Sequence, residues 1–221
     1  MRIASLALTL TSAFALVPGT LGAGEPVRIV ETLSVPLQAL PGSNTTHDLR
    51  LSLYTFRGTR WQHAEILPAV QESARLLAQC GISVSSADLR VLDAPRAFHF
   101  YSTPRSRVLL REMEVARPAL FFVEDTHNDP AFDAEAIGVS NAATRPELAN
   151  TVWVAYEARF LAKVLAHELV HVLSDSGEHT YEARNLMRPD TAPGNTRLSA
   201  AQCRALRDRG EANGLLSRRG R

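Results

Sequence analysis

The clearest helical segment of the chain spans residues 157–173 and carries two histidines four residues apart. Residues at this spacing project from the same face of a helix, so His167 and His171 can both reach one metal ion. Each imidazole can then place a nitrogen about 2.0–2.1 Å from a zinc ion. The segment therefore predicts a zinc (Zn2+) site on a helix whose other positions repeat apolar residues at helical spacing, namely Phe160, Leu161, Val164, Leu165, Leu169 and Val172.

Glu168 follows the first histidine and lies about 100° around the helix from it. At that position its carboxylate flanks the metal without being a ligand, which is where a general base is needed to take a proton from metal-bound water. The alternative is a pair of surface histidines on an amphipathic helix with no metal. The H-E-x-x-H pattern favours the zinc site, with Glu168 as the catalytic residue.

A catalytic zinc site needs a third protein ligand and one open position for water. The run from His167 reads H-E-L-V-H-V-L-S-D-S-G-E-H and ends at His179, and N-L-M-R-P follows at residues 185–189. This pattern resembles the metzincin clan of zinc endopeptidases, and matrixin-like members in particular. In that family H-E-x-x-H-x-x-G-x-x-H precedes a methionine turn beneath the metal, and the resemblance assigns this turn to Met187.

The spacing to the third ligand differs from the family pattern. Ser174 stands at the glycine position and Gly177 at the third-histidine position, so His179 comes two residues late. A helix that ran almost one turn further and ended with Gly177 in the left-handed conformation would bring His179 back to the metal. We therefore expect His179 as the third ligand. The alternatives are Asp175, which requires the helix to end early, and Glu178.

The expected secondary structure belongs to the α/β class, because strands interleave with two long helices. We expect helices at 65–79, 157–173 and 199–209, and an ambiguous segment at 105–114. The metzincin resemblance implies a twisted mixed sheet, a backing helix, an active-site helix and a small irregular C-terminal lobe. It also implies that the edge strand binds extended peptide by strand addition, through Gly138, Val139 and Ser140. The expected strands lie at 27–40, 49–54, 82–92, 119–123, 137–140 and 151–156.

The first residues have the order of a secretory signal peptide: a basic start, an apolar run over 3–17 and small residues before Glu25. A membrane anchor is the alternative, but the run is shorter than the roughly 20 residues that span a bilayer. We expect cleavage near residue 23, a secreted or periplasmic protein, and one catalytic domain over 24–221. Its upper lobe would span about 27–173 and its lower lobe about 174–221.

Export of the protein bears on the chemical state of its two cysteines, Cys80 and Cys203. An oxidising compartment permits a disulfide between them, and two unpaired thiols are the alternative. The 24 basic and 23 acidic side chains create no field that would attract nucleic acid or anionic lipid. We expect a monomer without a membrane span. The acid-rich segment 125–133 is either a structural calcium or second zinc site or, as we favour, a solvated loop.

These features together predict a secreted zinc-dependent endopeptidase, in which Glu168 activates zinc-bound water to hydrolyse peptide or protein substrates. The alternative from another class is an exported zinc-binding protein of metzincin-like fold without proteolytic activity. A metal-free adhesion or scaffold module is a third hypothesis. Metal content measured beside protein hydrolysis distinguishes the three.

Overall fold

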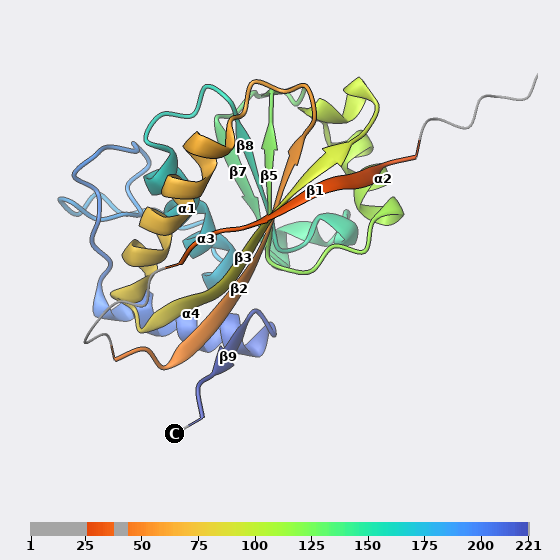
Figure 1. The fold of residues 1–221 in the computed structure, drawn as a ribbon. Helices are drawn as coiled ribbons and strands as arrows, with labels where there is room; N and C mark the ends of the chain where they lie inside the picture. Colours follow the sequence, from red (N-terminus) through yellow and green to blue (C-terminus); the bar gives the residue numbers. More distant parts are fainter. Residues whose placement is uncertain (1–25, 38–43, 221) are drawn as a thin grey trace, which may run out of the picture.

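A twisted mixed β-sheet forms the centre of the computed structural model, which describes residues 26–37 and 44–220 (Figure 1). Its strands follow the order β1-β3-β2-β5-β8-β7, and β9 pairs with the start of β2. Strands β3, β2, β5 and β8 run parallel, whereas β1, β7 and β9 are antiparallel to their neighbours. The bounds are β1 (Arg28–Ser34), β2 (His47–Phe56), β3 (Ile82–Asp93), β5 (Ala119–Val123), β7 (Ala134–Ile137), β8 (Thr151–Ala155) and β9 (Leu216–Arg218).

This arrangement confirms the expected α/β class and twisted mixed sheet. The predicted signal peptide falls outside the described residues, as do residues 38–40 of the strand predicted over 27–40. A second, two-stranded sheet pairs β4 (Phe100–Tyr101) with β6 (Asp125–Thr126), and β6 lies inside the segment expected to be a loop. Among the described residues, no helix has the length and apolar character needed to cross a membrane.

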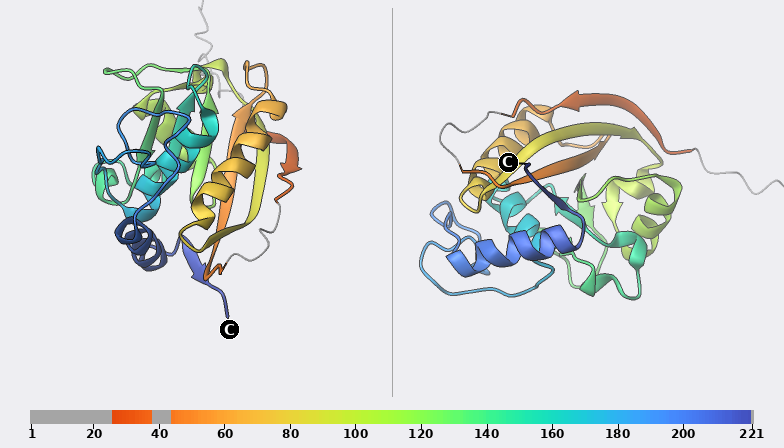
Figure 2. Two further views of the ribbon diagram at one scale, coloured as in Figure 1. Left: turned by 90° about the vertical axis from the view of Figure 1, so that its left-hand side faces the viewer. Right: turned by 90° about the horizontal axis from the view of Figure 1, so that it is seen from below.

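The two central strands β5 and β8 are buried at every position because helices or loops cover both faces of the sheet. Helices α1 (His63–Ala78) and α3 (Leu161–Ser174) cover one face, and α2 (Thr103–Glu112) lies over the other (Figures 1 and 2). The ambiguous segment 105–114 is thus helical. Short 3-10 helices occupy Arg96–His99, Ser140–Ala142 and Pro146–Leu148.

Helix α3 begins and ends at residues that differ from the sequence prediction. Residues 156–159 form a turn, and the helix begins after Phe160, which is left-handed with φ 55°. The helix ends at Ser174, and the left-handed residue that terminates it is Asp175 (φ 49°), not Gly177. An aspartate tolerates this conformation because its short polar side chain can form local hydrogen bonds. The proposed extension of the helix to Gly177 is therefore wrong.

The strand predicted over 137–140 lies earlier in the chain than expected. Strand β7 is Ala134–Ile137, and Val139 already has helical angles (φ −62°, ψ −44°). The reason is a contact with the end of α3: Asp175 Oδ1 accepts hydrogen bonds from the backbone and hydroxyl of Ser140. A Cβ on Gly138 would lie 2.5 Å from that same oxygen, so any larger residue would displace the Asp175 carboxylate from this position. The edge strand therefore ends before Gly138, Val139 and Ser140.

The C-terminal part consists of an irregular segment, 175–199, followed by α4 (Ala200–Ala212) and β9. Ser199 caps α4, since its side chain accepts a hydrogen bond from Gln202 N. Helix α4 packs against α3, and a disulfide joins Cys203 on α4 to Cys80 at the end of α1, with Cα atoms 4.7 Å apart. Strand β9, which pairs with β2 at the end of the chain, was not predicted from the sequence.

Candidate metal centre

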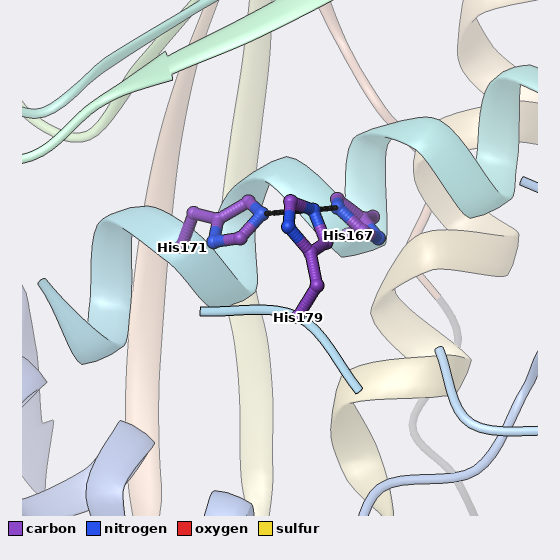
Figure 3. A group of neighbouring side chains, drawn as sticks. All are labelled: His167, His171 and His179. Carbon is purple, nitrogen blue, oxygen red and sulfur yellow. Dashed lines mark hydrogen bonds between the residues drawn. The ribbon is translucent and has the colours of Figure 1, made fainter. Parts of the chain in front are cut away.

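Three histidine side chains meet beside α3 (Figure 3). His167 and His171 project from adjacent turns of the helix, and His179 reaches them from the irregular segment that follows it. The Nε2 atom of His167 lies 3.0 Å from that of His171 and 3.1 Å from that of His179. The third separation, from His171 Nε2 to His179 Nε2, is 3.3 Å. The three nitrogens thus surround one point.

The other ring nitrogens of the two helix histidines are held by backbone carbonyls. His167 Nδ1 lies 2.8 Å from the oxygen of Leu186, and His171 Nδ1 lies 2.6 Å from the oxygen of Ser176. A carbonyl oxygen can only accept a hydrogen bond, so each Nδ1 carries the proton. In the neutral ring, Nε2 then presents a lone pair toward the point where the three nitrogens converge.

Burial keeps these two rings neutral. His167 is 6% exposed, and burial lowers its pKa. Burial, with a smaller contribution from His167, lowers the pKa of His171 to about 4. Both imidazoles are therefore unprotonated at neutral pH, which is the form that binds metal.

The separations between the nitrogens fit a metal ion bound by all three. Tetrahedral zinc with Zn–N bonds of about 2.0–2.1 Å places its nitrogen ligands roughly 3.3–3.4 Å apart. The lone pairs on the Nε2 atoms of His167 and His171, 3.0 Å apart, repel unless a cation or a proton lies between them. Over residues 26–37 and 44–220, these histidines form the one group of three or more His, Cys, Asp or Glu side chains able to share an ion. The acid-rich segment 125–133 forms no such group.

The two other residues weighed as third ligands lie elsewhere. The Asp175 carboxylate turns toward Ser140, with both hydrogen bonds at 2.9 Å. Glu178 is exposed and lies outside the histidine group, and it lines a second pocket that His179 and Met187 also line. Met187 itself is buried, at 2% exposure, and its carbonyl accepts a hydrogen bond from Thr180 N.

Glu168 lines the same cleft as the three histidines. Burial, and then the neighbouring carboxylate of Glu135, raise the pKa of Glu168 to about 8, while a hydrogen bond from the backbone of Ala136 acts in the opposite direction. A carboxyl group with this pKa can exchange a proton near neutral pH. The effect of Glu135 on Glu168 was not predicted from the sequence, because only the pairing of β7 with β8 brings Glu135 beside α3.

The cleft around the histidines has a volume of about 620 Å³. The edge strand β7 forms one wall through Ala134, Glu135 and Ala136, and the residues after Met187 form another. The remaining lining residues include Gly138, Glu157, Arg159, Val164, Ser176, Gly177, Pro189, Asp190 and Thr191. An elongated substrate could therefore lie between the strand edge and the histidines.

No family model matches the chain, and no curated protein matches it in sequence. The fold is similar to the crystal structure of metalloproteinase-II from Bacteroides fragilis, with a TM-score of 0.51 and 18% sequence identity. The match covers 80% of this chain and 57% of that one, so the chain spans little more than half the length of the solved structure it resembles. The chain thus has a metalloprotease-like fold.

Proposed function

We propose that this protein is a zinc-dependent endopeptidase of metzincin type. The observation that carries the proposal is the convergence of three imidazole nitrogens within 3.0–3.3 Å of one another beside a cleft. The similarity in fold to a metalloproteinase supports the same conclusion. His167, His171 and His179 would hold the metal, and Met187 would form the methionine turn.

The residues present suit the chemistry of peptide hydrolysis. A divalent ion held by the three imidazoles would supply a Lewis acid that polarises a carbonyl group and acidifies water. Glu168 is the group that moves protons: its carboxylate takes one from the attacking water and delivers it to the leaving amine. Burial raises the pKa of Glu168 to about 8 in the metal-free chain, and a cation bound nearby would lower this value and favour the carboxylate form that accepts the proton.

Strand β7 would align the substrate. It lies at the edge of the sheet, where β8 is its one neighbour among the described strands, and its residues Ala134 to Ala136 border the cleft. An extended peptide can add to such an edge through backbone hydrogen bonds. The proposed peptide-binding edge is therefore Ala134–Ile137.

We propose further that residues 1–23 are a signal peptide and that the mature protein, one catalytic domain, acts outside the cytoplasm. The disulfide between Cys80 and Cys203 supports this location, because disulfides persist in oxidising compartments. Expression of the full chain in a secreting host, followed by N-terminal sequencing of the exported protein, tests it. A mature N-terminus near Gly24 is expected, and retention of Met1 would contradict the proposal.

The decisive experiment measures metal content and hydrolysis together. Purified protein should carry one equivalent of zinc and cleave casein, and a chelator should abolish the cleavage. Glu168→Ala should keep the zinc and lose hydrolysis, by roughly a hundredfold or more. An undiminished rate in Glu168→Ala would refute the mechanism. One equivalent of zinc without hydrolysis of any substrate would favour the alternative, an exported zinc-binding protein.

A further inference from the structure

The backbone of residues 185–187 contacts the segments that carry two of the three histidines. The Leu186 carbonyl accepts the hydrogen bond from His167 Nδ1, at 2.8 Å. The next carbonyl, that of Met187, accepts a hydrogen bond of 2.9 Å from Thr180 N, directly after His179. Because these carbonyls belong to consecutive residues, the position of this short segment determines both the His167 ring and the backbone beside His179.

A pair of side-chain amides holds this segment in place. Asn185 Nδ2 donates to Gln202 Oε1 at 3.0 Å, and Gln202 Nε2 donates back to Asn185 Oδ1 at 3.3 Å. Asn185 Oδ1 also accepts the backbone N–H of Met187 at 2.9 Å, so the amide fixes the turn directly. Asn185 is 3% exposed, and its hydrogen bond with Met187 N is shielded from competing water.

Gln202 lies in the first turn of α4, whose position is fixed by a capping box and a disulfide. Its Oε1 accepts the backbone N–H of Ser199 at 2.7 Å, within the capping box that begins α4. The next residue, Cys203, forms the disulfide to Cys80, and Arg207 Nη1 donates to the Cys80 carbonyl at 2.7 Å. The amide pair thus connects the segment 185–187 to a helix that is covalently joined to the end of α1.

We propose that Asn185 and Gln202 are positioning residues for the metal ligands, acting through the carbonyls of Leu186 and Met187. Neither side chain touches the converging nitrogens. Hydrogen-bond partners of metal ligands set the orientation of the ligand rings, and their loss typically weakens metal binding about 10- to 100-fold. This inference rests on the metal-binding part of the proposed function.

The test compares Asn185→Ala and Gln202→Leu with the wild-type protein. Zinc affinity is measured by competition with a chromophoric chelator, and the visible absorption spectrum of the cobalt(II)-substituted protein reports the coordination geometry. Both variants should bind zinc about tenfold more weakly or worse. Their cobalt bands should shift or lose intensity. Gln202→Glu, which retains the acceptor for Ser199 N and Asn185 Nδ2, should recover part of the affinity.

Asn128→Ala is the matched control. Asn128 is partly buried, and like Asn185 it accepts a backbone N–H through Oδ1, from Thr103 at 3.1 Å. Its hydrogen bonds with Thr103 are at the start of α2. Thermal unfolding in the presence of a chelator measures the general loss of stability in each variant. Asn128→Ala should lower the melting temperature without changing zinc affinity or the cobalt spectrum.

Two results would overturn the inference. In the first, Asn185→Ala and Gln202→Leu keep wild-type zinc affinity and an unchanged cobalt spectrum. In the second, Asn128→Ala weakens zinc binding as much as they do, which would attribute the effect to general destabilisation. A wild-type protein that binds zinc without cleaving any peptide would refute the protease and leave this inference standing, because neither of its readouts is hydrolysis.

Discussion

Asp175 Oδ1 accepts two hydrogen bonds from Ser140, one from the backbone N–H and one from the hydroxyl, each 2.9 Å long. These bonds connect the residue that terminates α3 to the segment that follows the edge strand β7. They also occupy the carboxylate that the sequence offered as an alternative metal ligand. Asp175 thus connects the end of α3 to the segment after β7, on two sides of the cleft.

Replacing Asp175 with alanine should leave zinc binding intact and destabilise the protein. Loss of the two hydrogen bonds, and of a side chain suited to the left-handed conformation, should reduce the free energy of unfolding by about 1–3 kcal/mol. Urea unfolding and zinc stoichiometry, measured on the same preparation, check both parts. Asp175→Asn, which keeps an acceptor oxygen, should lose less stability. Loss of zinc from Asp175→Ala would identify the aspartate as a ligand instead.

Replacing His179 with alanine should reduce the bound zinc well below one equivalent. His179 Nε2 lies within 3.3 Å of both other ring nitrogens, so its removal leaves two protein ligands. The neighbouring Glu178→Gln serves as the control, because Glu178 is exposed and lies outside the histidine group. Metal analysis after dialysis should separate the two variants. Equal zinc content in both would show that His179 is not a ligand.

The metal-free protein should lose a stabilising contribution from Glu168 as pH rises. The pKa of this carboxyl is about 8 in the folded chain and near 4.5 in the unfolded chain, so the folded state binds more protons between these values. The contribution is complete below pH 4.5 and is lost as pH rises through 8, with a slope of up to about 1.4 kcal/mol per pH unit.

Glu168→Gln isolates this effect, because glutamine has no titrating proton. Urea unfolding in a chelator at pH values from 5 to 8 should show the wild-type stability falling relative to that of Glu168→Gln. The histidines act in the opposite direction: the lowered pKa values of His167 and His171 make stability fall as pH drops from about 6.5 toward 4. Parallel pH profiles for the two proteins would contradict the raised pKa.

The sequence predicted what depends on local spacing and missed what depends on distant contacts. His167, Glu168 and His171 share one helix, so their relative geometry follows from helical periodicity alone. The central strands were recognisable because continuous apolar runs such as 119–123 suit strands buried on both faces. Both predictions required no knowledge of how the chain returns on itself.

The path of the chain from His171 to His179 could not be derived from local sequence patterns. The helix ends where Asp175 meets Ser140, a residue 35 positions earlier, and no local pattern encodes that contact. Gly177 appeared to be the better left-handed residue because glycine has no steric penalty there, yet the tertiary contact selected the aspartate. The same contact displaced the end of the edge strand. Strand β9 was missed because it has only three residues.

Removal of the disulfide should destabilise the protein more than any of the single substitutions above. Cys80 and Cys203 are separated by 123 residues, and closing a loop of this length contributes about 4–5 kcal/mol in the chain-entropy model. The double variant Cys80→Ser/Cys203→Ser removes the bond without leaving a free thiol, and Cys80 and Cys203 are both buried, so two hydroxyl groups replace sulfur in the core. Urea unfolding of the oxidised wild type, the reduced wild type and the double variant separates the loss of the disulfide bond from the burial of two hydroxyl groups. Reduction alone should account for most of the loss. If the reduced and oxidised proteins unfold at the same urea concentration, the bond does not stabilise the native chain.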